Sequence, residues 1–141
     1  MYNTDPHTAP EESKIVVAHN PCYELIYDNS KNRIYLTVKG FWKNREAVPH
    51  FLDDLQKALR LVKPDFSLLS DLRTMLTHPQ RLSSLHIEAH NLIKLAGLSK
   101  AAIVVPIDRI ATLQVEEINS KSTMSSENFS SVVEAEIWLT A

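Results

Sequence analysis

Polar residues with reactive or ligand-binding side chains gather directly after a short apolar run, residues 66–69. A run of this kind, bounded by Pro64 and Asp71, is typical of a strand that is buried on both faces of a sheet. In open α/β sheets, ligands and partners meet the protein at the carboxyl ends of the strands. We therefore predict an interaction or ligand loop that is made of Ser70, Asp71, Arg73, Thr74, Thr77 and His78.

Each chemical role in this loop has a structural alternative. Asp71 could position a ligand or act as a base, but it could also accept backbone N–H bonds in the turn and pair with Arg73, which would keep it ionised. Thr77 and Gln80 match a capping box, although a phosphate on Thr77 would also be favourable at a helix N-terminus. No catalytic motif is complete, so we expect no enzyme. A catalytic site that uses Asp71, His78 or a histidine pair is the third hypothesis.

That histidine pair is His86 and His90, which lie one helical turn apart in the segment LHIEAH. The spacing allows two imidazoles to bind one metal ion, but the order H-x-E-x-H differs from the metalloprotease motif H-E-x-x-H. At about 3.6 residues per turn, both side chains are expected at the edge of the apolar stripe or in solvent. A third ligand would have to come from His50, His78 or an acidic residue. We therefore predict no metal site and no cofactor, with His86 and His90 as the candidate ligands if one exists.

A second group of candidate residues is apolar. Phe41 and Trp42 follow Gly40, between a predicted hairpin and a predicted helix. Together with Phe51 and Met75 they could line an apolar pocket, and a carrier of a small apolar or lipid-like molecule would need a closed pocket of several hundred cubic ångströms. The alternatives are an interface, or side chains that close the edge of the core.

The periodicity of apolar residues predicts the elements that position these side chains. Alternating aromatic and β-branched residues predict a hairpin, and continuous apolar runs predict two buried strands. Apolar residues three and four apart predict helices that start near Asn44, at the capping pair Thr77 and Gln80, after Asp108, and after Ser131. Ile110 is expected on the apolar side of the third helix, residues 120–126 are expected to be a loop, and Gly97 should end the second helix. The element order is β-β-α-β-α-β-α-(β)-α, which indicates an α/β fold with a mixed sheet of four to five strands and about four helices.

Composition limits the remaining possibilities. We assign residues 1–20 to a mobile tail, which could include a short extra strand at 14–19, and residues 21–141 to a single domain. A net charge of −2 without basic clusters argues against nucleic acid. The single cysteine, Cys22, favours a reducing compartment, and no apolar run reaches membrane-spanning length, so we expect a cytoplasmic protein without membrane insertion.

Four segments together carry a resemblance to a known family. They are the hairpin region 23–42, FSLLSDLR at 66–73, KAAIVV at 100–105 and NFSSVVEAEIWL at 128–139. In their order and spacing, the chain resembles the STAS and SpoIIAA-like superfamily over about residues 22–141, and in particular an uncharacterised bacterial branch that shares its fold with sporulation anti-anti-sigma factors. The resemblance implies a SpoIIAA-like fold and binding rather than catalysis.

One motif of that superfamily is absent. Its best understood branch carries an Asp-Ser pair after the central strand, and the serine of this pair is the phosphoacceptor. In this chain Ser70 precedes Asp71, and Thr74 and Thr77 follow, so that phosphorylation site does not carry over. Our first hypothesis is a non-enzymatic, regulatory STAS-like domain that contacts a protein partner or a second copy of itself. The alternative is a carrier or sensor of a small apolar or lipid-like ligand.

Overall fold

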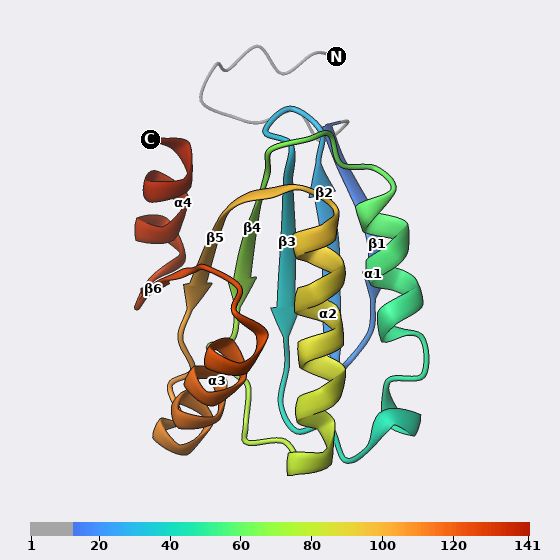
Figure 1. The fold of residues 1–141 in the computed structure, drawn as a ribbon, viewed down its shortest axis with the longest axis vertical. Coiled ribbons are helices and arrows are strands. Elements are labelled where there is room, and N and C mark those ends of the chain that lie inside the picture. The colour runs from blue at the N-terminus through green and yellow to red at the C-terminus, as the bar shows by residue number, and fades with distance from the viewer. Residues whose placement is uncertain (1–12) are drawn as a thin grey trace, which may run out of the picture.

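A single mixed β-sheet forms the centre of the computed structural model, which describes residues 13–141 (Figure 1). Its six strands follow one another across the sheet in chain order. The first three are antiparallel, and the third to the sixth are parallel. The strands are β1 (Lys14–His19), β2 (Tyr23–Asp28), β3 (Arg33–Val38), β4 (Phe66–Asp71), β5 (Leu98–Val104) and β6 (Glu127–Phe129).

The predicted α/β class, hairpin and helices are confirmed, but the sheet has six strands where four to five were expected. The difference comes from the two edges, where β1 pairs with β2 and the three-residue β6 pairs with β5. Short edge strands depend on their neighbours for stability, so their own sequences signal them weakly. Because β1 belongs to the sheet, the domain begins before residue 21. Of the tail predicted for residues 1–20, residues 1–12 lie outside the described residues.

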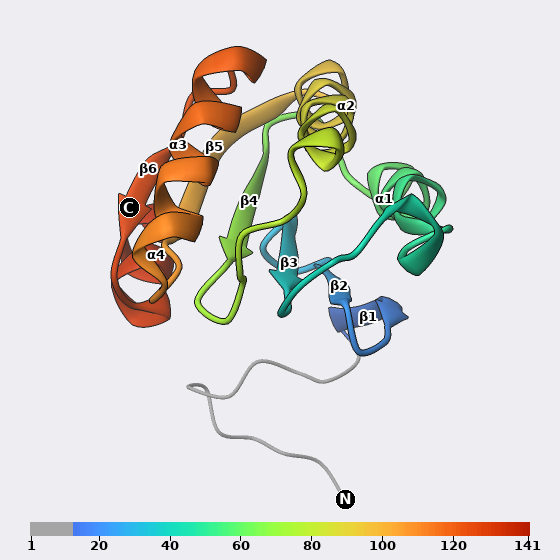
Figure 2. The same ribbon diagram turned by 90° about the horizontal axis from the view of Figure 1, so that it is seen from below.

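The helices cover the two faces of the sheet unequally. Buried residues of α1 (Phe51–Leu59), α2 (Ser83–Leu95) and α3 (Arg109–Ser122) lie on one face, where α1 and α2 run side by side (Figure 2). α4 (Val132–Thr140) packs on the other face, where Ala135 and Leu139 contact Leu69 and Ala102. Among residues 13–141, no helix has the length and apolar character needed to cross a membrane.

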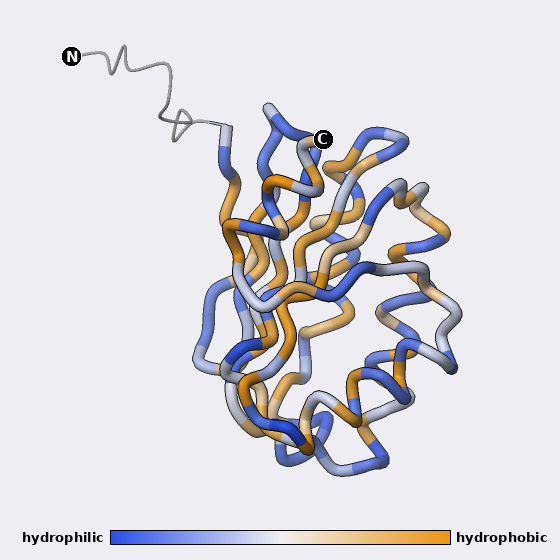
Figure 3. The backbone as a smooth tube through the Cα atoms, turned by 90° about the vertical axis from the view of Figure 1, so that its left-hand side faces the viewer, coloured by the Kyte–Doolittle hydropathy of each residue, from blue (hydrophilic) through white to orange (hydrophobic). Residues whose placement is uncertain are grey.

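Alternation along the strands divides the core between these faces. In β3, Ile34 and Leu36 point toward the three-helix side, whereas Tyr35 points toward α4. β4 and β5 alternate in the same way, with Leu68 and Ile103 in the larger cluster. Apolar residues accordingly run along the central strands (Figure 3).

The N-cap residues predicted for α3 and α4, Asp108 and Ser131, are confirmed. The Asp108 carboxylate accepts hydrogen bonds from the N–H groups of Ile110 and Ala111 (2.9 and 3.0 Å), and the Ser131 hydroxyl accepts one from Glu134 N–H. These bonds satisfy N–H groups that have no partner within the helix. Gly97 ends α2 with a positive φ of 97°.

The other helix starts were predicted wrongly. Asn44 caps a separate 3₁₀ turn, Arg45–Ala47, and α1 begins only at Phe51. Thr77 caps nothing, because Pro79 precedes a second 3₁₀ turn, Gln80–Leu82, and α2 starts after it. In addition, α3 runs to Ser122, into the segment that was expected to be a loop.

Candidate functional site

The loop after β4 is divided between the surface and the interior. Arg73 and Thr74 are exposed, and Asp71 and Thr77 are partly buried. Ser70 and His78 are buried, so the structure does not place them at the surface with the other predicted loop residues. Within this loop, the exposed residues Arg73 and Thr74 are therefore the ones best placed to contact a partner directly.

Of the two roles considered for Asp71, the structure shows the structural one, in which Asp71 pairs with Arg73. Its two carboxylate oxygens accept hydrogen bonds from the Arg73 guanidinium (2.9 and 2.8 Å), and one of them also accepts the Arg73 backbone N–H. Burial alone would raise the pKa of Asp71, but these bonds and the charge of Arg73 lower it below its ordinary value. Asp71 is therefore an ionised, fixed group rather than a poised base.

His78 joins the loop to three other segments. Its backbone N–H and C=O are both bound by the Gln114 carboxamide of α3 (2.8 and 2.7 Å). Its ring contacts Gly40 C=O through Nε2 (3.1 Å) and His86 Nε2 through Nδ1 (3.0 Å). The loop is thus held against both α2 and α3.

Trp42 and Phe51 belong to the core rather than to a pocket. The fully buried Trp42 ring lies nearly parallel to the His78 and His86 rings, at centroid distances of 4.9 and 5.3 Å, and its Nε1–H donates to Cys22 C=O (2.9 Å). Phe51 meets Trp42 edge to face. Phe41 is exposed instead, so the structure does not bring the four predicted pocket residues together.

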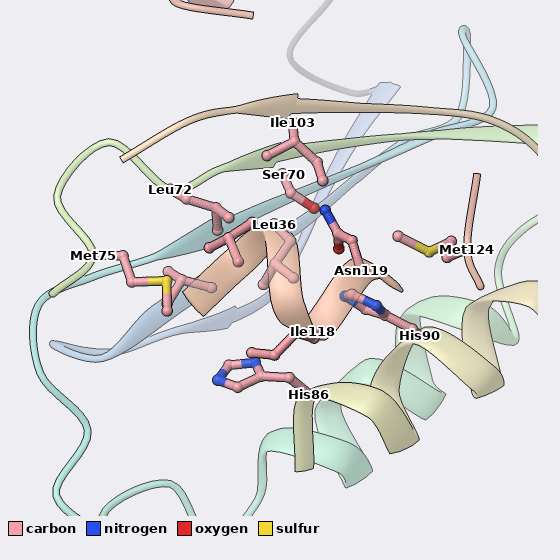
Figure 4. A pocket seen from close by; sticks show the side chains of 12 residues that line it. Leu36, Ser70, Leu72, Met75, His86, His90, Ile103, Ile118, Asn119 and Met124 are labelled. Carbon is pink, nitrogen blue, oxygen red and sulfur yellow. The ribbon is translucent and has the colours of Figure 1, made fainter. Parts of the chain in front are cut away.

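A small cavity lies between the sheet and the helices α2 and α3 (Figure 4). Its volume is about 40 Å³, and most of its lining is apolar, with Met75 as the one member of the predicted apolar set. His86 and His90 line it from α2. Both are partly buried beside the apolar stripe of α2, which agrees with the expected position at the helix edge, but this edge faces the cavity rather than open solvent.

The packing of α2 against α3 explains why this edge is not open to solvent. His90 Nδ1 lies 2.8 Å from the Ser122 hydroxyl, and Lys94 donates to Ser122 C=O and to the Thr123 hydroxyl. The edge of the apolar stripe of α2 at His90 and Lys94 is therefore packed against the end of α3. The periodicity of apolar residues in one helix does not predict which other helix packs against its edge.

The environment keeps these histidines neutral. Burial, with smaller contributions from the charges of His78 and His90, lowers the pKa of His86 to about 3. Burial and the charge of Lys94 lower the pKa of His90 to about 4, and burial also lowers that of His78. Across residues 13–141, no three His, Cys, Asp or Glu side chains are placed to hold a metal ion. His50, a possible third ligand, lies on an exposed helix end beside Asp53.

The histidines make stability depend on pH. They gain a proton near pH about 6.5 in the unfolded chain but only well below that in the folded chain, at about 3 for His86 and about 4 for His90. The unfolded state therefore binds more protons in this interval, and stability should fall by up to about 1.4 kcal/mol per histidine for each pH unit below about 6.5. Urea unfolding between neutral pH and pH about 5, above the carboxylate range, measures this slope.

A double variant tests the assignment to these two residues. In His86→Phe with His90→Leu, the pH slope should fall to the part that the buried His78 contributes. A slope as steep as that of the unaltered protein would show that other groups cause it.

Exposed apolar side chains surround the loop that follows β4, and the sequence analysis did not predict this surface. Ile107 N–H donates to Arg73 C=O, and Leu76 N–H donates to Gly40 C=O, which brings these segments together. Ile110 was expected to face the core but is 67% exposed. We call this the carboxyl-end surface; it consists of Phe41, Leu76, Ile107, Ile110 and Leu113.

The spacing within α3 offered a signal for this surface. Ile110 and Leu113 are three residues apart and lie on a different side of α3 from the buried Ala111, Val115 and Ile118. Two apolar stripes on one helix indicate two contact surfaces. Ile110 and Leu113 also line a shallow groove of about 340 Å³ that α3 forms with residues 77–83.

Comparison with known proteins identifies the fold. No family model matches the chain, and no curated protein matches its sequence. The structure is similar to the crystal structure of an uncharacterized protein from the DUF3478 family with a SpoIIAA-like fold, from Shewanella loihica PV-4. The TM-score is 0.61 at 13% identity, over 86% of this chain and 97% of that chain. The chain therefore has a SpoIIAA-like fold, which confirms the resemblance at the level of fold.

Proposed function

We propose that this chain is a non-enzymatic, regulatory domain that binds a protein partner through its carboxyl-end surface. The observation that carries the proposal is the group of five exposed apolar side chains around one anchored loop. Exposed apolar patches with a polar rim are typical of protein interaction sites. Here Arg73, Gln80 and Glu117 supply polar groups beside the apolar residues.

The hydrogen bonds of Asp71 and His78 support a role of this loop without catalysis. Arg73 occupies both oxygens of Asp71, and Gly40 and His86 occupy both ring nitrogens of His78. A general base needs a free lone pair within reach of its substrate. The free cysteine Cys22 is in keeping with a reducing, cytoplasmic location.

The second candidate function is ligand binding, which the cavity favours in a restricted form. Sites for drug-sized molecules have volumes of several hundred cubic ångströms, and this cavity has about 40 Å³. The cavity volume therefore favours a ligand of a few atoms over a large lipid-like ligand.

A matched pair of substitutions tests the interaction proposal. Leu113 on the carboxyl-end surface and Val133 on α4 are almost equally exposed, at 66% and 69%. Leu113→Asp should weaken the complex at least about tenfold, because it places a charge within an apolar contact. Val133→Asp should leave the complex intact. Native mass spectrometry of each variant, purified gently from its own cells, measures the species present.

The outcomes separate the possible partners. A complex with another chain that disappears with Leu113→Asp supports the proposal, and a dimer with the same sensitivity makes the partner a second copy. A complex that survives Leu113→Asp, or that is lost equally with Val133→Asp, contradicts it.

A further inference from the structure

The segments that follow β3, β4 and β5 are basic, although the chain as a whole is slightly acidic. These segments, residues 39–50, 72–82 and 105–110, lie at the same end of the sheet because the three strands are parallel (Figure 1). They contain six lysine or arginine residues and two acidic ones, a charge of +4, whereas the whole chain has a charge of −2. The positive charge of the molecule is therefore concentrated at the carboxyl ends of these strands.

Part of this positive charge is not neutralised within the molecule. Two of the arginines form ion pairs, Arg73 with Asp71 and Arg45 with Glu88. The exposed cations that have no carboxylate within ion-pair distance, among the residues that the structure describes, include Lys43, Arg81 and Arg109. Unpaired charges at the rim of an apolar surface select for partners of the opposite charge.

Two of these unpaired cations flank the groove between α3 and residues 77–83. Gln80 and Ile110 line its opposite walls, and they are the chain neighbours of Arg81 and Arg109. At the far end, Glu117 is already paired within α3 (2.9 Å). The unpaired positive charge therefore lies at the end of the groove that is near the start of α3.

The groove matches the shape of a helix. Ile110, Leu113, Gln114 and Glu117 line one wall at spacings of three and four residues, which is the repeat of a single helical stripe. Ile110 and Leu113 are 67% and 66% exposed, so this stripe is open. The stripe is about 10 Å long, which corresponds to about two turns of a second helix. Amphipathic helices bind grooves of this kind through apolar residues at the same spacings.

The combination of a concave apolar wall with basic groups favours an acidic protein segment over other anionic partners. Nucleic acids are bound largely through contacts between cations and phosphates, and the groove lining itself contains apolar and uncharged polar side chains together with Glu117. A bilayer presents no ridge that could enter the groove.

We propose that the partner inserts an acidic amphipathic helix into this groove. Its apolar residues contact Ile110 and Leu113, and its carboxylates lie beside Arg81 and Arg109. This inference rests on the proposed function, because it names the chemistry of the partner at the same surface. Since opposite charges attract across the rim, the complex should weaken as the salt concentration rises.

Three synthetic peptides of equal length, about 18 residues so that a helix can form, test the inference on the unaltered protein. The first places leucines at helical spacing with glutamates beside them. The second carries lysines instead of the glutamates, and the third has the composition of the first without its periodicity. In amide nitrogen–proton correlation spectra, the first should shift the signals of Gln80, Ile110 and Leu113 to a plateau and bind at least about tenfold more tightly than the others.

Charge reversal in the complex separates this inference from the proposed function. Arg81→Glu combined with Arg109→Glu should weaken the complex with the partner at least about tenfold, because attraction is replaced by repulsion. Arg60→Glu combined with Lys63→Glu is the matched control, since these two exposed cations precede the amino end of β4 at the opposite end of the sheet. The control should leave the complex unchanged in native mass spectra of the gently purified protein.

The outcomes distinguish the two proposals. A complex that is lost with Leu113→Asp but survives the reversal at Arg81 and Arg109 would overturn the inference and leave the proposed function standing, whereas survival in both cases would overturn both. The absence of a saturable shift with the acidic helical peptide, or equal binding of the three peptides, would also overturn the inference. So would tighter binding of a uridine oligonucleotide or of phosphatidylglycerol vesicles, because the surface would then recognise phosphate groups.

Discussion

Replacement of Trp42 by alanine is expected to lower the free energy of unfolding by about 3–5 kcal/mol. Trp42 is fully buried and contacts Tyr23, Phe51, His78 and His86, so its removal leaves a cavity that rigid neighbours cannot fill. The substitution also leaves Cys22 C=O without its indole donor. The cost therefore combines lost burial, an internal void and a lost hydrogen bond.

The adjacent Phe41 provides the control for this prediction. Its side chain is 54% exposed, so Phe41→Ala should change the free energy of unfolding by less than about 0.5 kcal/mol. Urea unfolding followed by far-ultraviolet circular dichroism measures both variants without relying on the removed indole. Equal effects of the two substitutions would show that Trp42 does not organise the core beside the site.

The second large effect is expected for Glu136→Ala. Arg33 is buried, and its guanidinium donates to Glu136 Oε2 (2.7 Å) and to the Ser67 hydroxyl (2.8 Å). Loss of the carboxylate leaves a buried positive charge without its partner, which should cost about 3–5 kcal/mol. Because Glu136 lies in α4 and Arg33 in β3, the substitution should also loosen α4 from its face of the sheet.

Glu134 is the matched control in the same helix, since its side chain is exposed. Glu134→Ala should shift the urea midpoint only slightly. Hydrogen exchange of the α4 amides should rise in Glu136→Ala and stay at the wild-type level in Glu134→Ala. Unchanged stability of Glu136→Ala would mean that Ser67 and solvent suffice for Arg33.

Much of the fold could be predicted because its signals are local. The apolar run at Phe66 and the alternation in β3 reflect burial on both faces or on one face, and each is visible within six residues. Asp108 and Ser131 could be predicted as N-caps because a capping side chain bonds to N–H groups only two or three residues further along the chain. The pairing of Asp71 with Arg73 is equally local, two positions apart.

The parts of the site that the sequence analysis missed or predicted wrongly depend on packing between distant segments. His86 and His90 line a cavity because the end of α3 packs against the edge of the apolar stripe of α2, and neither helix carries that information alone. Thr77 matches a capping box, yet Gln114 of α3 holds the neighbouring His78 and the helix starts later. The spacing predicts Ile110, Ala111, Val115 and Ile118 on the inward side of α3, and the last three are buried there, but Ile110 is exposed.

Photo-crosslinking from defined positions tests the proposed interaction surface most directly. A benzophenone side chain at Leu113 should form covalent adducts with one protein, either a partner or a second copy of this chain, when activated in the source cells. The same group at Val133, which is equally exposed on α4, should form none with that protein. Adducts from Val133 but not from Leu113, or identical adducts from both positions, would contradict the assignment of the carboxyl-end surface as the binding site.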